Sequence, residues 1–136
     1  MTPKLIILHH SLTEDGKTVS WNAIRQYHLK KGWNGIGYHF GIELVGNHYE
    51  ILIGRLPTEI GAHCYGVNKS SLGICFVGNF DLEEPPLEQL NVGRGLIRSL
   101  MEVFNISSEW VKGHCEYSQK SCPGKKFPLG EFVRGL

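Results

Sequence analysis

The sequence predicts an α/β fold, because strand-like and helix-like segments alternate along its 136 residues. Residues 5–8 are apolar throughout, as in a short buried strand, and residues 38–44 show the period of two that is typical of a strand. Apolar residues recur at helical spacing after Pro85 and Pro86, which can start a helix. We therefore expect a single domain, residues 1–136, with a central mixed β-sheet flanked by helices.

Capping and turn residues set the bounds of the remaining elements. Ser20 can cap a helix that runs to about residue 31 and that Gly32 and Gly35 end. The other expected segments are a polar loop at 11–18, a turn at 45–48, strands at 49–53 and 71–77, a loop at 55–68, a helix at 85–104, a short strand at 110–112 and a helical turn at 128–133.

Composition is that of a globular protein and argues against several partners. Hydrophobic residues make up 41% of the chain and charged residues 20%, and the formal charge is +1. Lys and Arg are scattered, without the basic stripe of a nucleic-acid binder, so we expect no nucleic acid. The apolar run before His9 is too short for a signal peptide or a membrane span. We expect a cytoplasmic monomer that does not insert into membranes.

The four cysteines are expected to be thiols or metal ligands rather than disulfides, since the sequence predicts no secretion. Cys75 lies in an apolar strand and is expected to be an inert core thiol. Cys122 lies eight residues after His114, on a loop long enough to bring both side chains to one ion. Either His9 or His10 can add a third ligand, since neighbours on a strand point to opposite faces. Catalytic zinc needs three such ligands and one open position, but this spacing alone does not decide the site.

Six segments, in order, resemble the type-2 N-acetylmuramoyl-L-alanine amidases. This family includes lysozyme-type phage endolysins and peptidoglycan recognition proteins. The likeness covers nearly the whole chain. The matching segments are Ile7-Leu8-His9-His10-Ser11, Gly35-Ile36-Gly37-Tyr38-His39-Phe40, Gly61-Ala62-His63, Gly73-Ile74 with Gly78-Asn79-Phe80, Gly113-His114, and Lys120-Ser121-Cys122-Pro123-Gly124.

The resemblance implies a zinc centre with two catalytic neighbours. Its zinc ligands are His9, His114 and Cys122, so that His10 is left to pack or to support the site. Tyr38 and Lys120 are the implied catalytic partners, which stabilise the oxyanion and manage protons in a division that the sequence leaves open.

The resemblance also implies a substrate and a place for it. His63 and Asn68 are expected to line a groove for the glycopeptide, with zinc at the floor of a surface cleft. The expected reaction is hydrolysis of the amide between the N-acetylmuramoyl lactyl group and L-alanine in bacterial peptidoglycan. A bacteriolytic phage or prophage endolysin, reaching the cell wall after membrane breach, is the expected setting. A cytosolic muropeptide-recycling amidase and a peptidoglycan-binding module without activity are the alternatives, although family members that only bind generally lack the zinc cysteine.

Two further hypotheses come from other classes of site. A cysteine hydrolase would use Cys122 as nucleophile and His114 as base, but this leaves His9 without a role. A purely structural zinc domain would need four closed ligands, and no convincing fourth is present in the sequence.

Overall fold

The computed structural model describes residues 1–13, 15 and 20–136, including only the backbone of Ser20. The expected cap at Ser20 and residues 14 and 16–18 of the expected loop lie outside the described residues. In chain order the elements are β1 (Leu5–His10), α1 (Ser20–Lys30), β2 (Phe40–Val45), β3 (His48–Ile53), β4 (Ser71–Phe76), α2 (Leu87–Phe104), the 3₁₀ turn η1 (Ser108–Trp110), β5 (Val111–Gly113), the 3₁₀ turn η2 (His114–Glu116) and α3 (Leu129–Arg134).

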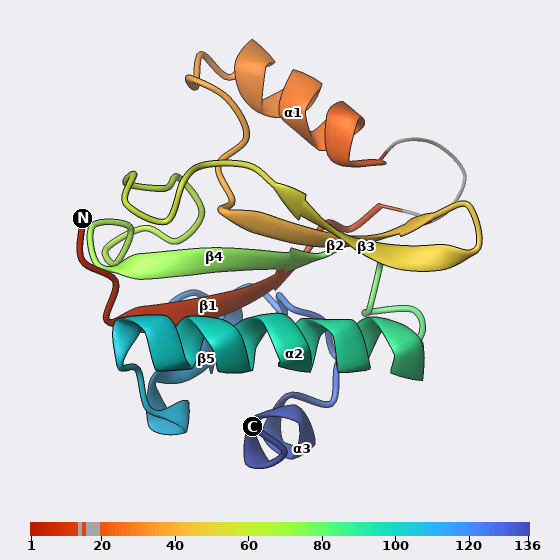
Figure 1. The fold of residues 1–136 in the computed structure, drawn as a ribbon. Helices are drawn as coiled ribbons and strands as arrows, with labels where there is room; N and C mark the ends of the chain where they lie inside the picture. The colour runs from red at the N-terminus through yellow and green to blue at the C-terminus, as the bar shows by residue number, and fades with distance from the viewer. Residues whose placement is uncertain (14, 16–19) are drawn as a thin grey trace.

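The five strands form one mixed sheet in the order β3-β2-β4-β1-β5, with α1 on one face and α2 and α3 on the other (Figure 1). β1 pairs in parallel with both β4 and β5, β2 pairs in parallel with β4, and only the β2–β3 hairpin is antiparallel. The expected fold class is confirmed. Every residue of β1 and β4 is buried, which explains why both strands are apolar nearly throughout.

The alternation along β1 sends its two terminal histidines to opposite faces of the sheet. Leu8 packs into the main core on the side of α2, whereas Ile7 packs with Cys64 on the other side. Successive side chains of a strand alternate. His9 therefore lies on the face of Ile7, and His10 lies on the face of Leu8.

α2 covers the main core with one apolar stripe. Leu90, Ile97 and Leu100 are its buried apolar residues, and the helix ends at Asn105, whose φ of 54° is left-handed. Gly93 allows close packing, since a Cβ there would lie 2.5 Å from the Phe76 ring. No helix within the described residues is both long and apolar enough to span a bilayer.

Tyr38 does not belong to the strand that the sequence predicts. The expected strand at 38–44 would place Tyr38 on the face of Phe40, but β2 begins at Phe40 itself. Tyr38 instead packs on the α1 side, where its ring stacks on Trp21 at a centroid distance of 6.3 Å. The period of two fails here because the paired residues of β2 begin only at Phe40, and residues 34, 35, 37 and 39 before it are bends.

His28 fastens α1 to the segment that precedes Tyr38. Its Nδ1 accepts a 2.8 Å hydrogen bond from the backbone N–H of Gly37, and its ring lies 4.5 Å from that of Trp33. Burial, together with the charges of Lys31 and Arg55, lowers the pKa of His28 from 6.5 to about 4. The neutral ring is thus part of the folded structure.

We expect the free energy of unfolding to depend on His28 at acidic pH. A histidine whose folded pKa is lowered stabilises the fold fully above its unfolded pKa. This stabilisation is lost as pH falls from 6.5 toward about 4, because the unfolded chain takes up a proton that the folded ring does not. Urea unfolding should therefore show a shallower loss of stability over this range for His28→Asn than for the wild type. The exposed His48→Asn is the matched control, and identical slopes for all three proteins would contradict the expectation.

Candidate metal centre and catalytic site

His9, His114 and Cys122 form a cluster at the carboxyl ends of strands β1 and β5. His9 lies near the end of β1, His114 directly follows β5, and Cys122 comes from the loop after η2. Their candidate ligand atoms all lie within 4.8 Å of one another. His9 Nδ1 is 3.6 Å from Cys122 Sγ, and the rings of His9 and His114 are 4.7 Å apart. Two imidazoles and a thiolate are a donor set that zinc accepts, and in the described residues this cluster has no fourth member.

Burial favours the neutral forms of both His9 and Cys122 in the metal-free chain. Burial holds the pKa of His9 well below 6.5, with further lowering by His63 and His114, so the imidazole is neutral as a ligand must be. Burial raises the pKa of the Cys122 thiol to about 12. A reactive cysteine needs a stabilised thiolate. A zinc-bound cysteine needs the thiolate as well, so the observation that weakens the cysteine-hydrolase hypothesis is the position of His9 in the same cluster, for which that hypothesis has no role.

The loop that carries Cys122 is held by contacts from two other segments, at Asp81 and at Cys115. The Asp81 carboxylate accepts 2.9 Å hydrogen bonds from the Ser121 hydroxyl and from the backbone N–H of Lys125. Cys115 donates its N–H to the carbonyl of Cys122 at 2.7 Å. These bonds bracket Cys122 on both sides and fix its backbone.

His10 contributes its backbone to the cluster while its ring packs elsewhere. Its N–H points to Cys122 Sγ at 3.4 Å. The ring stacks on Phe80 and accepts that residue's N–H at Nδ1, at 3.0 Å. The packing role expected for His10 is confirmed.

Tyr38 and Lys120 flank the cluster from different environments. The Tyr38 ring lies 5.1 Å from the ring of His9. Burial raises the pKa of Tyr38 well above 10, with smaller contributions from Cys75 and Cys122, so the phenol stays protonated at neutral pH. Lys120 is exposed, and after burial its positive charge is the second cause that lowers the pKa of His114.

His63 contacts the nitrogen of the His9 ring that does not face Cys122, and Asn68 bonds to the backbone of His63. His63 Nδ1 is 3.0 Å from His9 Nε2, with the two rings edge to face. Burial lowers the pKa of His63 to about 3, a shift that His39 increases and that a hydrogen bond to the Ser71 backbone opposes. The side-chain oxygen of Asn68 accepts the N–H groups of His63 and Cys64, each at 2.9 Å. The expected groove-lining role of both residues stays a prediction.

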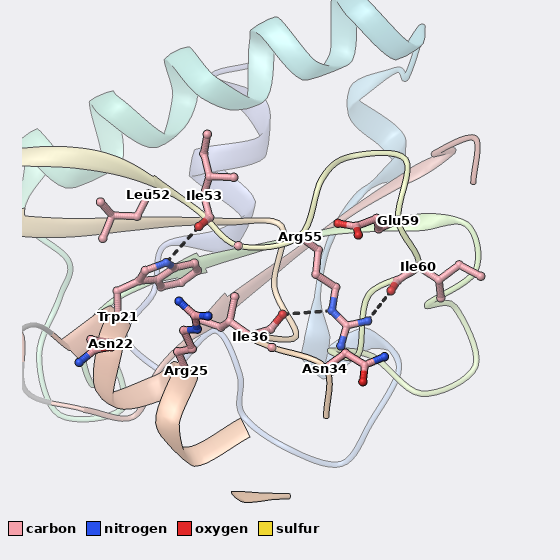
Figure 2. A pocket seen from close by; sticks show the side chains of 12 residues that line it. Trp21, Asn22, Arg25, Asn34, Ile36, Leu52, Ile53, Arg55, Glu59 and Ile60 are labelled. Carbon is pink, nitrogen blue, oxygen red and sulfur yellow. Dashed lines mark hydrogen bonds between the residues drawn. The ribbon is translucent and has the colours of Figure 1, made fainter. Parts of the chain in front are cut away.

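A pocket of about 750 Å³ lies between α1 and the β3 edge of the sheet (Figure 2). Its wall is joined to the cluster through Trp21, which stacks on Tyr38. Arg55 stiffens the opposite side, since its guanidinium donates to the carbonyls of Ile36 at 3.1 Å and Ile60 at 2.6 Å. The lining residues are Trp21, Asn22, Arg25, Asn34, Gly35, Ile36, Leu52, Ile53, Gly54, Arg55, Glu59 and Ile60.

The profile of the N-acetylmuramoyl-L-alanine amidases matches residues 1–125, which is most of the chain. The chain belongs to this family. The endolysin of Enterobacteria phage T3 is 31% identical over 128 residues, covering 90% of this chain and 81% of the endolysin. The N-acetylmuramoyl-L-alanine amidase LysC from Clostridium intestinale URNW has a similar structure, with a TM-score of 0.87 at 35% identity, covering 100% of this chain and 86% of LysC.

A recognition protein is also similar, over a smaller share of its length. Peptidoglycan-recognition protein LE of Drosophila melanogaster is 34% identical over 130 residues, which are 90% of this chain. The chain spans only 37% of that protein. Both catalytic and recognition names therefore occur among the relatives of this amidase-family domain.

Sequence reasoning missed several residues that support the site. Trp21 lies in the segment predicted as a helix without any sign of a role at the site, and Asp81 and Ser71 carry no signal that their side chains are needed. Gly73 did carry one, because a glycine inside an apolar strand indicates close approach of another group. A Cβ at Gly73 would lie 2.5 Å from the His63 ring.

We expect this amidase-family domain to bind zinc through Cys122. Removing the thiolate takes away one of three ligands, so Cys122→Ala should lose most of its bound zinc, measured by elemental analysis after dialysis. Cys64→Ala removes another buried thiol and should retain wild-type zinc content. Equal zinc in the two variants would contradict the assignment of Cys122.

Proposed function

We propose that this domain is a zinc-dependent amidase that cleaves the bond between the N-acetylmuramoyl lactyl group and L-alanine in peptidoglycan. One observation carries the proposal above the others. His9, His114 and Cys122 converge beside the half-buried ring of Tyr38, in a chain that matches the amidase family over residues 1–125.

The residues around the centre divide the work according to their environments. Zinc, when bound by the three ligands, supplies Lewis acidity and activation of a water molecule. Tyr38 keeps its proton and is placed to donate a hydrogen bond to the oxyanion that forms when the amide carbonyl is attacked. Lys120 adds a positive charge on the exposed side, near His114. The departing amine needs a proton, and these two side chains are the candidates to manage it.

The pocket beside Trp21 is the best candidate for part of the substrate. It is large enough to hold several residues of a peptide or sugar, and Trp21 connects its wall to Tyr38. Arg25 and Asn34 provide exposed polar groups along its rim. A bound strand would thus extend from the pocket toward the metal centre.

A recognition module without activity is the alternative that the family allows. Such a module needs no metal, and family members of this kind generally lack the zinc cysteine. Cys122 is present here, and its backbone is fixed on both sides. This arrangement favours the enzyme.

The proposed activity is tested by peptide release from purified peptidoglycan. The wild type should release peptides with free L-alanine amino groups, lose this activity with a chelator and regain it on addition of zinc. Full activity in the metal-free protein would sink the proposal.

Tyr38→Phe should separate catalysis from folding. Loss of one oxyanion donor commonly lowers kcat by about 100- to 1000-fold, and we expect a loss of this order with zinc content unchanged. Tyr27→Phe removes a hydroxyl from an exposed ring on α1 and should keep wild-type kcat. A Tyr38→Phe enzyme as fast as the Tyr27→Phe control would exclude a catalytic hydroxyl.

We further propose that the polymeric wall is the substrate, as for an endolysin. The support is the similarity to the phage T3 endolysin over 81% of that protein. Turnover of intact sacculi should then exceed turnover of small anhydro-muropeptides at equal concentrations of stem peptide. The opposite preference would indicate a muropeptide-recycling amidase.

A further inference from the structure

His63 joins His9 to the sheet through a continuous line of polar contacts. His9 Nε2 lies 3.0 Å from His63 Nδ1, and His63 Nε2 lies 3.5 Å from the hydroxyl oxygen of Ser71. The same hydroxyl is 2.7 Å from the carbonyl oxygen of Val67. A carbonyl oxygen only accepts, so the Ser71 hydroxyl proton points to Val67.

This direction decides where the protons of both imidazoles lie. Because the Ser71 hydroxyl donates its hydrogen bond to the Val67 carbonyl, the Ser71 oxygen can only accept a hydrogen bond from His63. His63 Nε2 therefore carries the N–H. A neutral imidazole has one N–H, so with that N–H at Nε2 the Nδ1 of His63 is an acceptor. His9 must then donate from Nε2. The lone pair of His9 Nδ1 is left facing Cys122 Sγ, 3.6 Å away.

The reverse arrangement would disable His9 as a ligand. A proton on His63 Nδ1 would make His9 Nε2 the acceptor and move the His9 proton to Nδ1, on the side of Cys122. It would also place two lone pairs together at His63 Nε2 and the Ser71 oxygen. The contacts therefore select one of two possible tautomer pairs.

The fold holds the His63 ring in the place that this role requires. A Cβ at Gly73 would come within 2.5 Å of the ring, and one at Gly61 within 2.6 Å, so both glycines leave room for it. Asn68 fixes the backbone by accepting the N–H groups of His63 and Cys64. These contacts position the ring against His9.

We propose that His63 is a positioning residue that fixes the tautomer and ring orientation of the metal ligand His9, with Ser71 setting the direction of the hydrogen bonds. The inference rests on the metal centre of the proposed function, and it gives His63 a role other than lining the substrate groove. Partners of this kind commonly change metal affinity by about 10- to 100-fold when they are removed.

The tautomers can be read directly in the metal-free wild-type protein. Long-range ¹H–¹⁵N correlation spectra at neutral pH should show both His9 and His63 protonated at Nε2 and unprotonated at Nδ1. Ser71→Ala should allow the second tautomer of His63 to appear. A proton on His9 Nδ1 in the wild type would overturn the proposal.

Zinc affinity tests the same role without any measurement of activity. We expect His63→Ala to raise the zinc dissociation constant by about 10- to 100-fold in competition with a chelator. His63→Asn, whose side-chain oxygen can accept from His9 Nε2, should recover most of the affinity, and His28→Ala controls for the loss of a buried histidine away from the ligands. A folded His63→Ala protein with wild-type affinity would contradict the proposal, and so would a His63→Asn protein no better than it. If His63→Ala does not fold, the wild-type spectrum and His63→Asn decide.

Failure of this inference can be told apart from failure of the proposed function. If zinc binding depends on His63 but the protein releases no peptide, the proposed amidase function is excluded and the positioning role of His63 stands. An active zinc amidase whose zinc affinity is unchanged in His63→Ala would keep the proposed function and exclude the positioning role.

Discussion

The parallel pairing of β1 with β5 is the constraint on which the site depends. Leu8 lies opposite Gly113, so the chain reaches His9 and His114 at the same level of the sheet, on adjacent strands. Parallel strands end at a common edge, which brings side chains that are far apart in sequence together without a long loop. Cys122 then needs only the short connection after η2. A shift of β1 by one residue would turn His9 into the α2 core and bring His10 to the metal side.

Three of the buried histidines are kept neutral and oriented by the backbone. His10, His28 and His39 each accept a backbone N–H at Nδ1, from Phe80, Gly37 and Gly73 respectively. Burial is the largest cause that lowers the pKa of all three. Each ring thus satisfies a buried N–H that would otherwise be costly to leave unpaired.

His9 differs from these three histidines, because it is oriented by another side chain. Its Nε2 contacts the imidazole of His63 rather than a backbone group. This difference leaves Nδ1 directed at the cluster. The His9 ring, a candidate metal ligand, therefore has a support that the backbone alone does not provide.

Strand and helix patterns predicted the fold class and most elements, since burial of β1 and β4 leaves a plain apolar signature. The candidate ligands could be named because ordered motifs resolved the ambiguity between His9 and His10. The environment of Tyr38 could not be read in this way, because a period of two says nothing about a residue that precedes the ladder. The contact between His9 and His63 could not be predicted from the sequence either, because it depends on how closely the loop that carries His63 packs against Gly73.

Trp21 gives the pocket and the metal centre a common support. Its indole lies so close to β2 that a Cβ at Gly41 would come within 2.3 Å of the ring. The indole N–H donates to the carbonyl of Ile53 at 3.4 Å, which ties α1 to β3 as well (Figure 2). The Tyr38 ring stacks on this same indole and lies 5.1 Å from the ring of His9. The Trp21 indole thus packs against both the pocket wall and the Tyr38 ring that lies beside His9, so that a change at Trp21 would disturb the pocket and the cluster together.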